Sequence, residues 1–252
     1  MNEIREIVHY SEYTAELRIY APSVAKSCRP GHFVIVRFSE DGARIPFTIV
    51  DSDEGKGTIN IIIHKAAGLS EALASLKPGD SLPNLLGPLG QAIEIKNYGT
   101  VVCCGDGAGF VPLLPVVRAL KKAGCHVISV FSEQSSQTAC LQGKVSEYSE
   151  VIDVRDRNPL EVIGEIIDSR KIDKMFISGP TTLLKDISGL TLTHSIPTVC
   201  ILNMIMVDGV GLCGICRVMV DGERKLTCID GPSFDAHKVD FDQLLNRQRL
   251  YV

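Results

Sequence analysis

The sequence of 252 residues has no long apolar run, no basic block and no low-complexity tract. A membrane-spanning helix needs roughly eighteen or more apolar residues, and the opening MNEIREIVHY lacks an apolar signal region, so we expect no membrane span and a cytoplasmic location. Lysine and arginine number 26 against 30 acidic residues, a net charge of −4. Because no basic stripe is present to follow a phosphate backbone, we expect no nucleic-acid partner.

The sequence also lacks the residue patterns of a hydrolase. It shows no nucleophile with a matching base, no paired carboxylates and no metal-hydrolase motif, so no catalytic side chain is assigned. The nine cysteines are an odd number and include the adjacent Cys103 and Cys104, which favours free thiols in a reducing compartment over a disulfide framework. The length and the 45% hydrophobic content suit two ordinary domains with an appendage.

Three cysteines do form a pattern, within a glycine-rich stretch near the C-terminal end. Cys213 and Cys216 are a C-x2-C pair among glycines, and Cys228 follows across a short predicted hairpin. Three soft thiolates on a tightly folding loop suit an iron–sulfur cluster or zinc. The C-x4-C-x2-C spacing of plant-type [2Fe–2S] centres would place a further cysteine at Asp208.

The fourth ligand has two candidates. A carboxylate can bind iron and carries the same charge as a thiolate, which makes Asp208 reasonable, and Cys200 is the other candidate. The competing interpretation is a partial zinc ribbon completed by His237. Spacing and glycine content favour the iron–sulfur cluster.

Residues 1–97 contain short β-rich segments at close spacing, which predict a small antiparallel barrel. Inside it, the run from Arg44 supplies a guanidinium for a flavin pyrophosphate, Pro46 and Phe47 as an apolar wall, and Thr48 as a hydroxyl near the reactive nitrogen. The run matches the R-x-[PY]-[FY]-[ST] signature of ferredoxin–NADP reductase-like flavin domains.

A second phosphate-compatible element follows the strand that is predicted to end near residue 65. It leads into a short helix whose capped N-terminus can seat a phosphate, and an ordinary helix cap is the alternative. The candidate cofactor contacts there are His64, Lys65, Gly68, Leu69 and Ser70. Two such elements in one barrel favour FAD. A G-P-L-G turn within residues 84–90 is expected to end the barrel.

Residues 98–202 alternate between apolar strands and helical patterns, which predicts βαβ units around a parallel sheet. The first strand runs into a loop ending at Pro112. Gly105, Gly107 and Gly109 of that loop allow a dinucleotide pyrophosphate to approach the backbone closely.

Asp106 weakens this nucleotide interpretation. Its carboxylate would lie near two phosphate charges, which is unfavourable. A Rossmann-like scaffold kept for architecture is therefore the alternative to a working nicotinamide site. If a dinucleotide binds, Glu133 at the end of the second strand favours NAD over NADP.

The run LNMIMVDGVGLCGICRVMV and the tail DGPSFDAHKVDFDQLLNRQRLY resemble the small subunit of NADH-dependent ferredoxin–NADP oxidoreductase, also called sulfide dehydrogenase. In that family the motif D-G-x-G-x-C-G-x-C holds a [2Fe–2S] cluster with one aspartate and three cysteines, which would be Asp208, Cys213, Cys216 and Cys228. The electron-transfer subunit of dihydroorotate dehydrogenase B is a more distant relative with cysteine at the aspartate position. Relatives carry G-G-G-x-G-x-A-P at Gly105–Pro112.

The resemblance implies a ferredoxin-reductase-like fold in three parts: an FAD-binding antiparallel β-barrel (1–97), a nicotinamide-nucleotide-binding-like α/β domain (98–202) and a [2Fe–2S] subdomain (203–252). It implies electron transfer between NAD(H), FAD and the cluster, with the flavin converting two-electron into one-electron steps. A larger oxidoreductase subunit, a flavin or iron–sulfur protein, is the expected partner. The alternatives are a dihydroorotate dehydrogenase B subunit, and a relay or scaffold with a degenerate NAD site.

Overall fold

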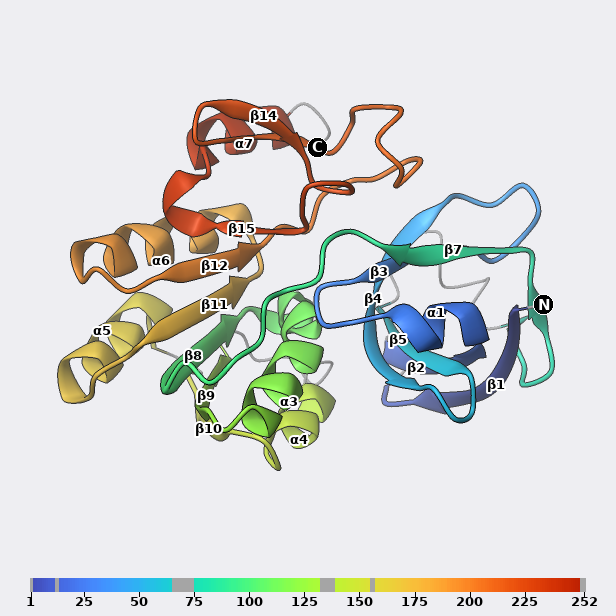
Figure 1. The fold of residues 1–252 in the computed structure, drawn as a ribbon, viewed down its shortest axis with the longest axis horizontal. Coiled ribbons are helices and arrows are strands. Elements are labelled where there is room, and N and C mark those ends of the chain that lie inside the picture. The colour runs from blue at the N-terminus through green and yellow to red at the C-terminus, as the bar shows by residue number, and fades with distance from the viewer. Residues whose placement is uncertain (1, 12–13, 65–74, 132–138, 155–156, 250–252) are drawn as a thin grey trace.

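The computed structural model describes residues 2–11, 14–64, 75–131, 139–154 and 157–249. Its framework is two sheets, one of seven antiparallel strands and one of six largely parallel strands, and the C-terminal segment packs beside the second sheet (Figure 1). Within these ranges, no helix is long and apolar enough to cross a membrane. The predicted architecture of an antiparallel barrel joined to an α/β unit is confirmed.

The first sheet is a nearly closed barrel with the strand order β6-β1-β2-β5-β4-β3-β7. Its strands are β1 (Asn2–His9), β2 (Thr14–Tyr20), β3 (Phe33–Arg37), β4 (Ile45–Asp53), β5 (Thr58–His64), β6 (Ser81–Leu82) and β7 (Asn84–Leu89), with the short helix α1 (Pro22–Ser27) between β2 and β3. Successive side chains of β3 point to opposite faces of the sheet and so enter two different cores. Val34 and Val36 face the barrel core, whereas Phe33 and Ile35 join a core shared with the C-terminal segment.

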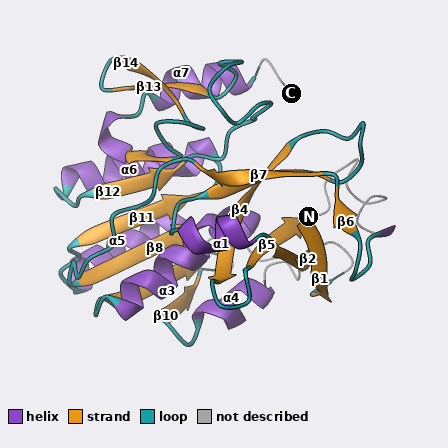
Figure 2. Cartoon of the chain, turned by 45° about the vertical axis from the view of Figure 1, so that its right-hand side comes forward, coloured by secondary structure: helices purple, strands orange, loops and turns teal. Residues whose placement is uncertain are grey.

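The second sheet has the order β10-β9-β8-β11-β12-β15, and only the β12–β15 pair is antiparallel. Its strands are β8 (Thr100–Gly105), β9 (His126–Phe131), β10 (Glu150–Asp153), β11 (Lys174–Ser178), β12 (Thr198–Ile201) and β15 (Ser233–Asp235). Helices flank both faces (Figure 2): α3 (Leu114–Lys122) and α4 (Ala139–Val145) on one, α5 (Pro159–Ser169) and α6 (Thr181–Thr193) on the other. Parallel strands with both faces covered account for the near-continuous apolar runs.

The sequence pattern of residues 112–123 predicts a helix that starts at Pro112, but the observed helix begins differently. A 3-10 helix, η1 (Gly107–Leu113), precedes α3 and contains Pro112. The Gly109 N–H donates to the Asp106 carbonyl at 2.6 Å, which closes the first turn of η1. The loop after β8 is thus already wound into a helix where an extended glycine loop was predicted.

The polar pattern of residues 234–249 predicts a helical tail, but the tail opens with strand β15. The 3-10 helix η2 (Ala236–Lys238) and the helix α7 (Phe241–Gln248) follow. Phe234 pairs with Cys200 of β12, so pairing with a distant strand overrides the local helical pattern.

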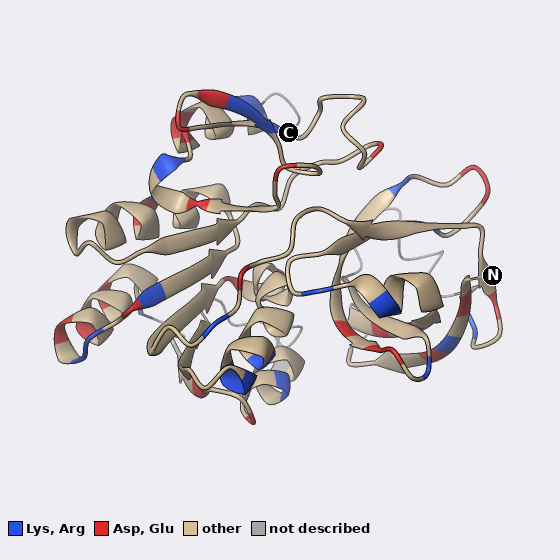
Figure 3. Cartoon of the chain, viewed as in Figure 1, with Lys and Arg blue, Asp and Glu red and all other residues tan. Residues whose placement is uncertain are grey.

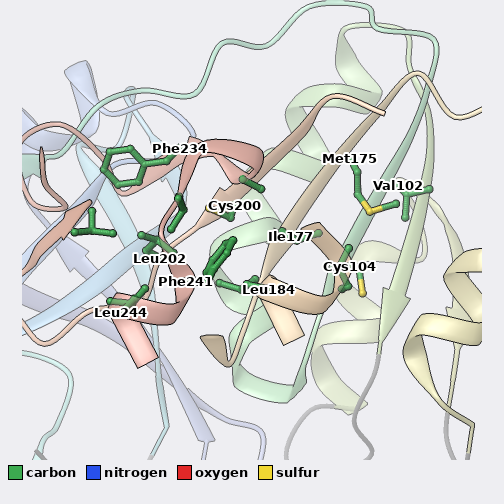
Figure 4. Close-up of a cluster of buried hydrophobic side chains, with 14 of the residues drawn as sticks. Val102, Cys104, Met175, Ile177, Leu184, Cys200, Leu202, Phe234, Phe241 and Leu244 are labelled. Atoms are coloured by element: carbon green, nitrogen blue, oxygen red, sulfur yellow. The ribbon is translucent and has the colours of Figure 1, made fainter. Parts of the chain in front are cut away.

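One apolar core connects the parts of the molecule. It holds Phe33 and Ile35 of the barrel, side chains from α5 and α6, and the C-terminal Phe234, Phe241 and Leu244. Figure 4 shows Cys200 of β12, and Leu202 just after that strand, among these C-terminal side chains. The C-terminal segment is therefore anchored in the same core as both sheets.

Candidate functional site

A hairpin returns the chain to the predicted cluster loop. Strands β13 (Arg217–Val220) and β14 (Glu223–Leu226) pair in antiparallel register across a two-residue turn whose residues both have positive φ. The turn after β14 then meets the loop: the Thr227 N–H donates to the Cys216 carbonyl at 3.0 Å, and the Cys228 N–H donates to Cys216 Sγ at 3.4 Å. The hairpin thus brings the third cysteine beside the second.

Asp208 lies at the other end of the loop. Its carboxylate accepts hydrogen bonds from the N–H groups of Val210 at 2.9 Å and Cys213 at 2.5 Å. Desolvation acts to raise the pKa of Asp208, but these backbone donors outweigh it and lower the pKa. The side chain is therefore a carboxylate, held next to the first cysteine.

The four predicted ligands meet in pairs. Asp208 contacts Cys213, and Cys216 contacts Cys228, while Asp208 also acts electrostatically on Cys228. Burial, together with the Cys216 thiol, raises the pKa of Cys228 to about 12. No three His, Cys, Asp or Glu side chains of the described ranges converge on one point.

These residues nevertheless fit an iron–sulfur cluster. Three thiols and one carboxylate, on one loop and the turn that faces it, are a donor set that iron accepts. An unpartnered buried hydroxyl, that of Thr227, lies next to Cys228. Binding requires the cysteines to lose their protons, and the bound iron ions favour that loss.

The alternative ligands lie elsewhere. Cys200 is fully buried in the middle of β12, between Ile177 and Phe234, and burial raises its pKa to about 12 (Figure 4). His237 bonds through Nε2 to Thr191 of α6 at 3.0 Å. The geometry therefore favours Asp208 as the fourth ligand.

Glycines seat the loop against the barrel. Gly209 has a φ of +72°, and a Cβ built there would lie 2.7 Å from Cγ1 of Ile35 in β3. Gly211 has a φ of +84°, and its Cβ would lie 2.8 Å from Ile229. Glycine permits the left-handed backbone at both positions, and it is the contact of Gly209 that seats the loop on the predicted flavin barrel, whereas Gly211 meets the turn that follows Cys228.

Two of the predicted flavin residues, Pro46 and Thr48, lie on the same face of the barrel as this contact, whereas Phe47 pairs with Val34 and packs against the barrel core. Register pairs Phe33 with Thr48 and Ile35 with Pro46, so these side chains share one face. A narrow cavity of about 50 Å³ separates that face from the chain leading to the cluster loop. It is lined by Phe33, Pro46, Phe47, Thr48, Pro112, Ile201, Leu202, Asn203, Met204, Met206 and Pro232. The ring of Phe47 also packs edge-to-face against Phe38, with centroids 5.9 Å apart.

Arg44 lines a second cavity, of about 520 Å³, together with Arg37, Met206 and Asp208. This volume is within the usual range of ligand pockets. Arg37 was not predicted from the sequence, although alternation along β3 places it on the face of Ile35. Its Nε is buried without a hydrogen-bond partner, and two guanidinium groups at one cavity suit an anionic ligand.

His64, at the end of β5, has one free ring nitrogen. Its Nδ1 contacts Thr14 Oγ1 at 3.0 Å, whereas Nε2 is buried and unpartnered. Burial lowers the pKa of His64, so the ring is neutral near pH 7. The predicted contacts Lys65, Gly68, Leu69 and Ser70 lie outside the described residues.

The glycine loop after β8 is packed closely against its neighbour. A Cβ on Gly105 would lie 2.9 Å from Cα of Phe110, and one on Gly109 would lie 2.6 Å from Cα of Gly179, after β11. Gly107 has a φ of +48°. Close backbone contacts thus favour glycine at positions 105 and 109, and the left-handed backbone favours it at position 107. Asp106 stands beside Gly179, whose Cβ would lie 3.3 Å from that of Asp106.

A group of exposed apolar side chains surrounds the predicted cluster ligands, and sequence reasoning missed it. Leu212 is 87% exposed. The others are Ile205, Val207, Val210 and Ile229, each at least 39% exposed. The sequence does contain a signal for this group: aliphatic residues lie in or beside a glycine-rich loop, where they belong to no strand or helix that could bury them.

Comparison with known proteins shows which proteins this chain resembles. Residues 203–240 match the family model of the iron–sulfur cluster binding domain of dihydroorotate dehydrogenase B. A homologue of the dihydroorotate dehydrogenase B (NAD(+)) electron transfer subunit from Thermotoga maritima is 36% identical over 258 residues, covering 100% of this chain and 92% of that protein. The electron transfer subunit from Desulforamulus reducens is 28% identical over 235 residues, covering 87% and 89%.

Solved structures agree. The NADH-dependent reduced ferredoxin-NADP oxidoreductase structure, described in connection with flavin-based electron bifurcation, matches with a TM-score of 0.91 and 33% identity over 100% of this chain and 94% of that one. A ferredoxin NADP+ reductase from Neisseria gonorrhoeae matches in fold, with a TM-score of 0.60 at 15% identity over 76% and 89%. The resemblance inferred from the motifs is confirmed. The chain belongs to the family of the electron transfer subunits of dihydroorotate dehydrogenase B and their homologues.

Proposed function

We propose that this chain is the electron-transfer subunit of an oxidoreductase, passing electrons between NAD(H), FAD and a [2Fe–2S] cluster to a larger partner subunit. The observation that carries the proposal is the cavity shared by Arg44, the predicted flavin contact, and Asp208, the predicted iron ligand. Met206 lines this cavity and also the narrow one beside Thr48. Flavin and cluster residues thus meet across one short stretch of chain.

The barrel residues have distinct roles toward FAD. Arg44, with Arg37 beside it, pairs with the pyrophosphate, while Pro46 and Phe47 limit the ring and exclude water. Thr48 presents a hydroxyl to the ring's reactive edge. A bound flavin exchanges a hydride with nicotinamide and single electrons with a cluster.

The loop residues hold the cluster. Asp208, Cys213, Cys216 and Cys228 bind the iron, and the contact of Gly209 with Ile35 fixes the loop on the barrel. The division into residues 1–97, 98–202 and 203–252 follows these roles. We further propose a cytoplasmic location, which the free cysteines support.

Asp106 favours a second candidate function, an electron relay that binds nicotinamide nucleotides weakly. The loops after β8 and β11 meet at Gly109 and Gly179, where Gly105 and Gly107 would also approach a dinucleotide. The Asp106 carboxylate stands at that meeting point and opposes a pyrophosphate. In this case the flavin is reduced through the cluster or the partner instead of by NADH.

The exposed apolar side chains around the cluster loop support a docking surface for the partner subunit. Residues 203–216 include a single charged side chain, Asp208, and the loop is correspondingly almost uncharged in Figure 3. Leu212, at 87% exposed, is its most prominent residue. Exposed apolar groups of this kind mark protein interaction sites, and depletion of charge is typical of interface centres.

The test is the cofactor content of anaerobically purified protein. We expect about two irons, two sulfides and one FAD per chain. A colourless protein with stoichiometric zinc, or one that releases FMN, would refute the proposal. Rapid flavin reduction by NADH separates the full electron-transfer function from the relay, which is reduced slowly by NADH.

The docking surface is tested by co-purification with a candidate partner, an oxidoreductase subunit expressed together with this chain. Leu212→Glu should abolish the complex while leaving the iron, sulfide and FAD contents unchanged. Leu192→Glu is the matched control, because Leu192 is 57% exposed on α6, away from the loop. Equal complex formation by both variants would contradict the surface.

A further inference from the structure

Thr227 holds a buried hydroxyl that the fold leaves unused. The residue is fully buried, and its Oγ1 is one of four buried side-chain polar atoms in the described ranges that have no hydrogen-bond partner. The other three belong to Arg37, His64 and Arg118, each of which bonds through another nitrogen. Among these four, only Thr227 has a side chain with no hydrogen bond at all.

No acceptor of the turn around Thr227 is hydrogen-bonded to this hydroxyl. The Cys216 carbonyl already accepts the Thr227 N–H at 3.0 Å. The Leu226 carbonyl accepts two amides, from Ile229 at 2.9 Å and Asp230 at 2.7 Å. Because burying an unpaired hydroxyl is unfavourable, a native turn that keeps one indicates a missing acceptor.

The nearest chemistry that could supply the acceptor is sulfur. Thr227 precedes Cys228, and its backbone is bonded to Cys216, so it lies between two predicted iron ligands. The thiols of these two cysteines contact each other. When a cluster is bound, thiolate and sulfide sulfurs there carry negative charge and accept hydrogen bonds.

We propose that the Thr227 hydroxyl donates a hydrogen bond to a sulfur of the [2Fe–2S] cluster and thereby raises its reduction potential. The inference rests on the proposed function, since it requires the cluster. Reduction adds one electron to the cluster, and a donor at sulfur stabilises that added charge. In this role Thr227 touches the cluster directly but does not bind iron.

The experiment is an anaerobic redox titration of the cluster-loaded protein, followed by the electron paramagnetic resonance signal of the reduced cluster. Thr227→Val removes the hydroxyl and keeps the shape, and Thr227→Ser keeps the hydroxyl. Thr191→Val is the matched control, because Thr191 is equally buried but bonded in α6 to the Ser188 carbonyl and His237.

We expect Thr227→Val to lower the ratio of reduced to oxidised cluster at a fixed potential by about three- to tenfold, where tenfold corresponds to about 59 mV for one electron. Thr227→Ser and Thr191→Val should titrate like the wild type. If the valine variant loads poorly, Thr227→Ala must shift the titration in the same direction.

An unchanged titration of a fully loaded Thr227→Val or Thr227→Ala variant would overturn the inference. It would mean that the hydroxyl meets a buried water molecule or nothing, and the proposed function would stand. An equal shift in Thr191→Val would overturn it as well, since the effect would then be unspecific. A wild-type protein without a [2Fe–2S] cluster would instead sink the proposed function itself.

Discussion

The seating of the cluster loop on the barrel can be measured with two glycines of the same loop. Gly209 and Gly214 both have positive φ, +72° and +66°. Alanine at either position adopts a left-handed backbone at a cost of about 1–2 kcal/mol. The two sites differ in the room that they leave for an added Cβ. A Cβ at Gly209 would lie 2.7 and 2.9 Å from Cγ1 and Cδ1 of Ile35, whereas a Cβ at Gly214 would have nothing within 4 Å.

Ile35 cannot move away from an added methyl group. It is fully buried and belongs to the core that joins the barrel to the C-terminal segment. Forcing an extra carbon into such a core costs about 1–3 kcal/mol. Gly209→Ala should therefore lower the free energy of unfolding by about 2–5 kcal/mol and Gly214→Ala by about 1–2 kcal/mol.

The assay is urea unfolding of the reduced, iron-free protein, so that cluster binding does not contribute. The difference between the two variants isolates the contact between loop and barrel, because the backbone cost is common to both. Equal midpoints for the two variants, or a greater loss in Gly214→Ala, would show that the loop does not rest on Ile35. Predicted flavin and cluster residues would then lack their structural link.

Three further predictions concern single charges. Arg44→Ala should weaken FAD binding about ten- to a hundredfold, because a charge-assisted contact contributes about 1.5–3 kcal/mol. Fluorescence titration with FAD would show this loss, and an unchanged affinity would exclude Arg44 from the site. Asp106→Asn should strengthen NADH binding about five- to tenfold, since unit charges 4 Å apart interact by about 1–4 kcal/mol, and the effect should be larger at low ionic strength than at high. If isothermal titration calorimetry shows no gain in NADH affinity, Asp106 does not belong to the nucleotide site. Lys144→Met should lower the free energy of unfolding by about 3 kcal/mol at pH 7, whereas Lys121→Met, at an exposed position, should change it little. The destabilisation by Lys144→Met should become smaller as the pH is lowered.

The sign of that pH dependence follows from the buried group Glu16. Its carboxylate accepts hydrogen bonds from Tyr10 at 2.5 Å and Asn60 at 2.6 Å, and Lys144 Nζ of α4 lies 2.6 Å away. Desolvation raises the pKa of Glu16, but the bonds from Lys144, Tyr10 and Asn60 outweigh it, so the folded pKa is lowered. The stabilisation is thus present above the ordinary glutamate pKa of about 4.3 and is lost as the pH falls through the folded pKa.

Local signals in the sequence predicted the elements that depend on neighbouring residues. The hairpin of β13 and β14 follows from alternation around Asp221-Gly222, and β8 and β11 follow from apolar runs that a covered parallel sheet requires. The proximity of Asp208 to Cys213 could also be predicted, since only four residues of glycine-rich loop lie between them. Periodicity and spacing suffice where the contacts are short in sequence.

Elements that depend on distant partners were not predictable in this way. A G-P-L-G turn was expected within residues 84–90, yet these residues form β7, which pairs with β3 some fifty positions earlier, with Arg37 opposite Asn84. Strand β15 exists because Phe234 pairs with Cys200. The glycines of the loop after β8 suggested a phosphate, although Gly109 is already required by its contact with Gly179. A glycine pattern alone does not distinguish a close ligand from a close backbone.

The cluster loop is fixed by contacts to both sheets, which gives the proposed electron path a rigid frame. Gln91, just after β7, donates its backbone N–H to the Gly231 carbonyl at 2.6 Å and its side-chain amide to the Ile229 carbonyl at 2.9 Å. Two residues further on, β15 joins the second sheet. The turn that carries Cys228 is thus tied to the barrel on one side and to the sheet on the other. A site held on rigid elements keeps its geometry during turnover, so the separation between flavin and cluster is set by the fold and not by the partner. The exposed side chains of the proposed docking surface, such as Leu212, lie outside this frame and are free to adapt to a partner.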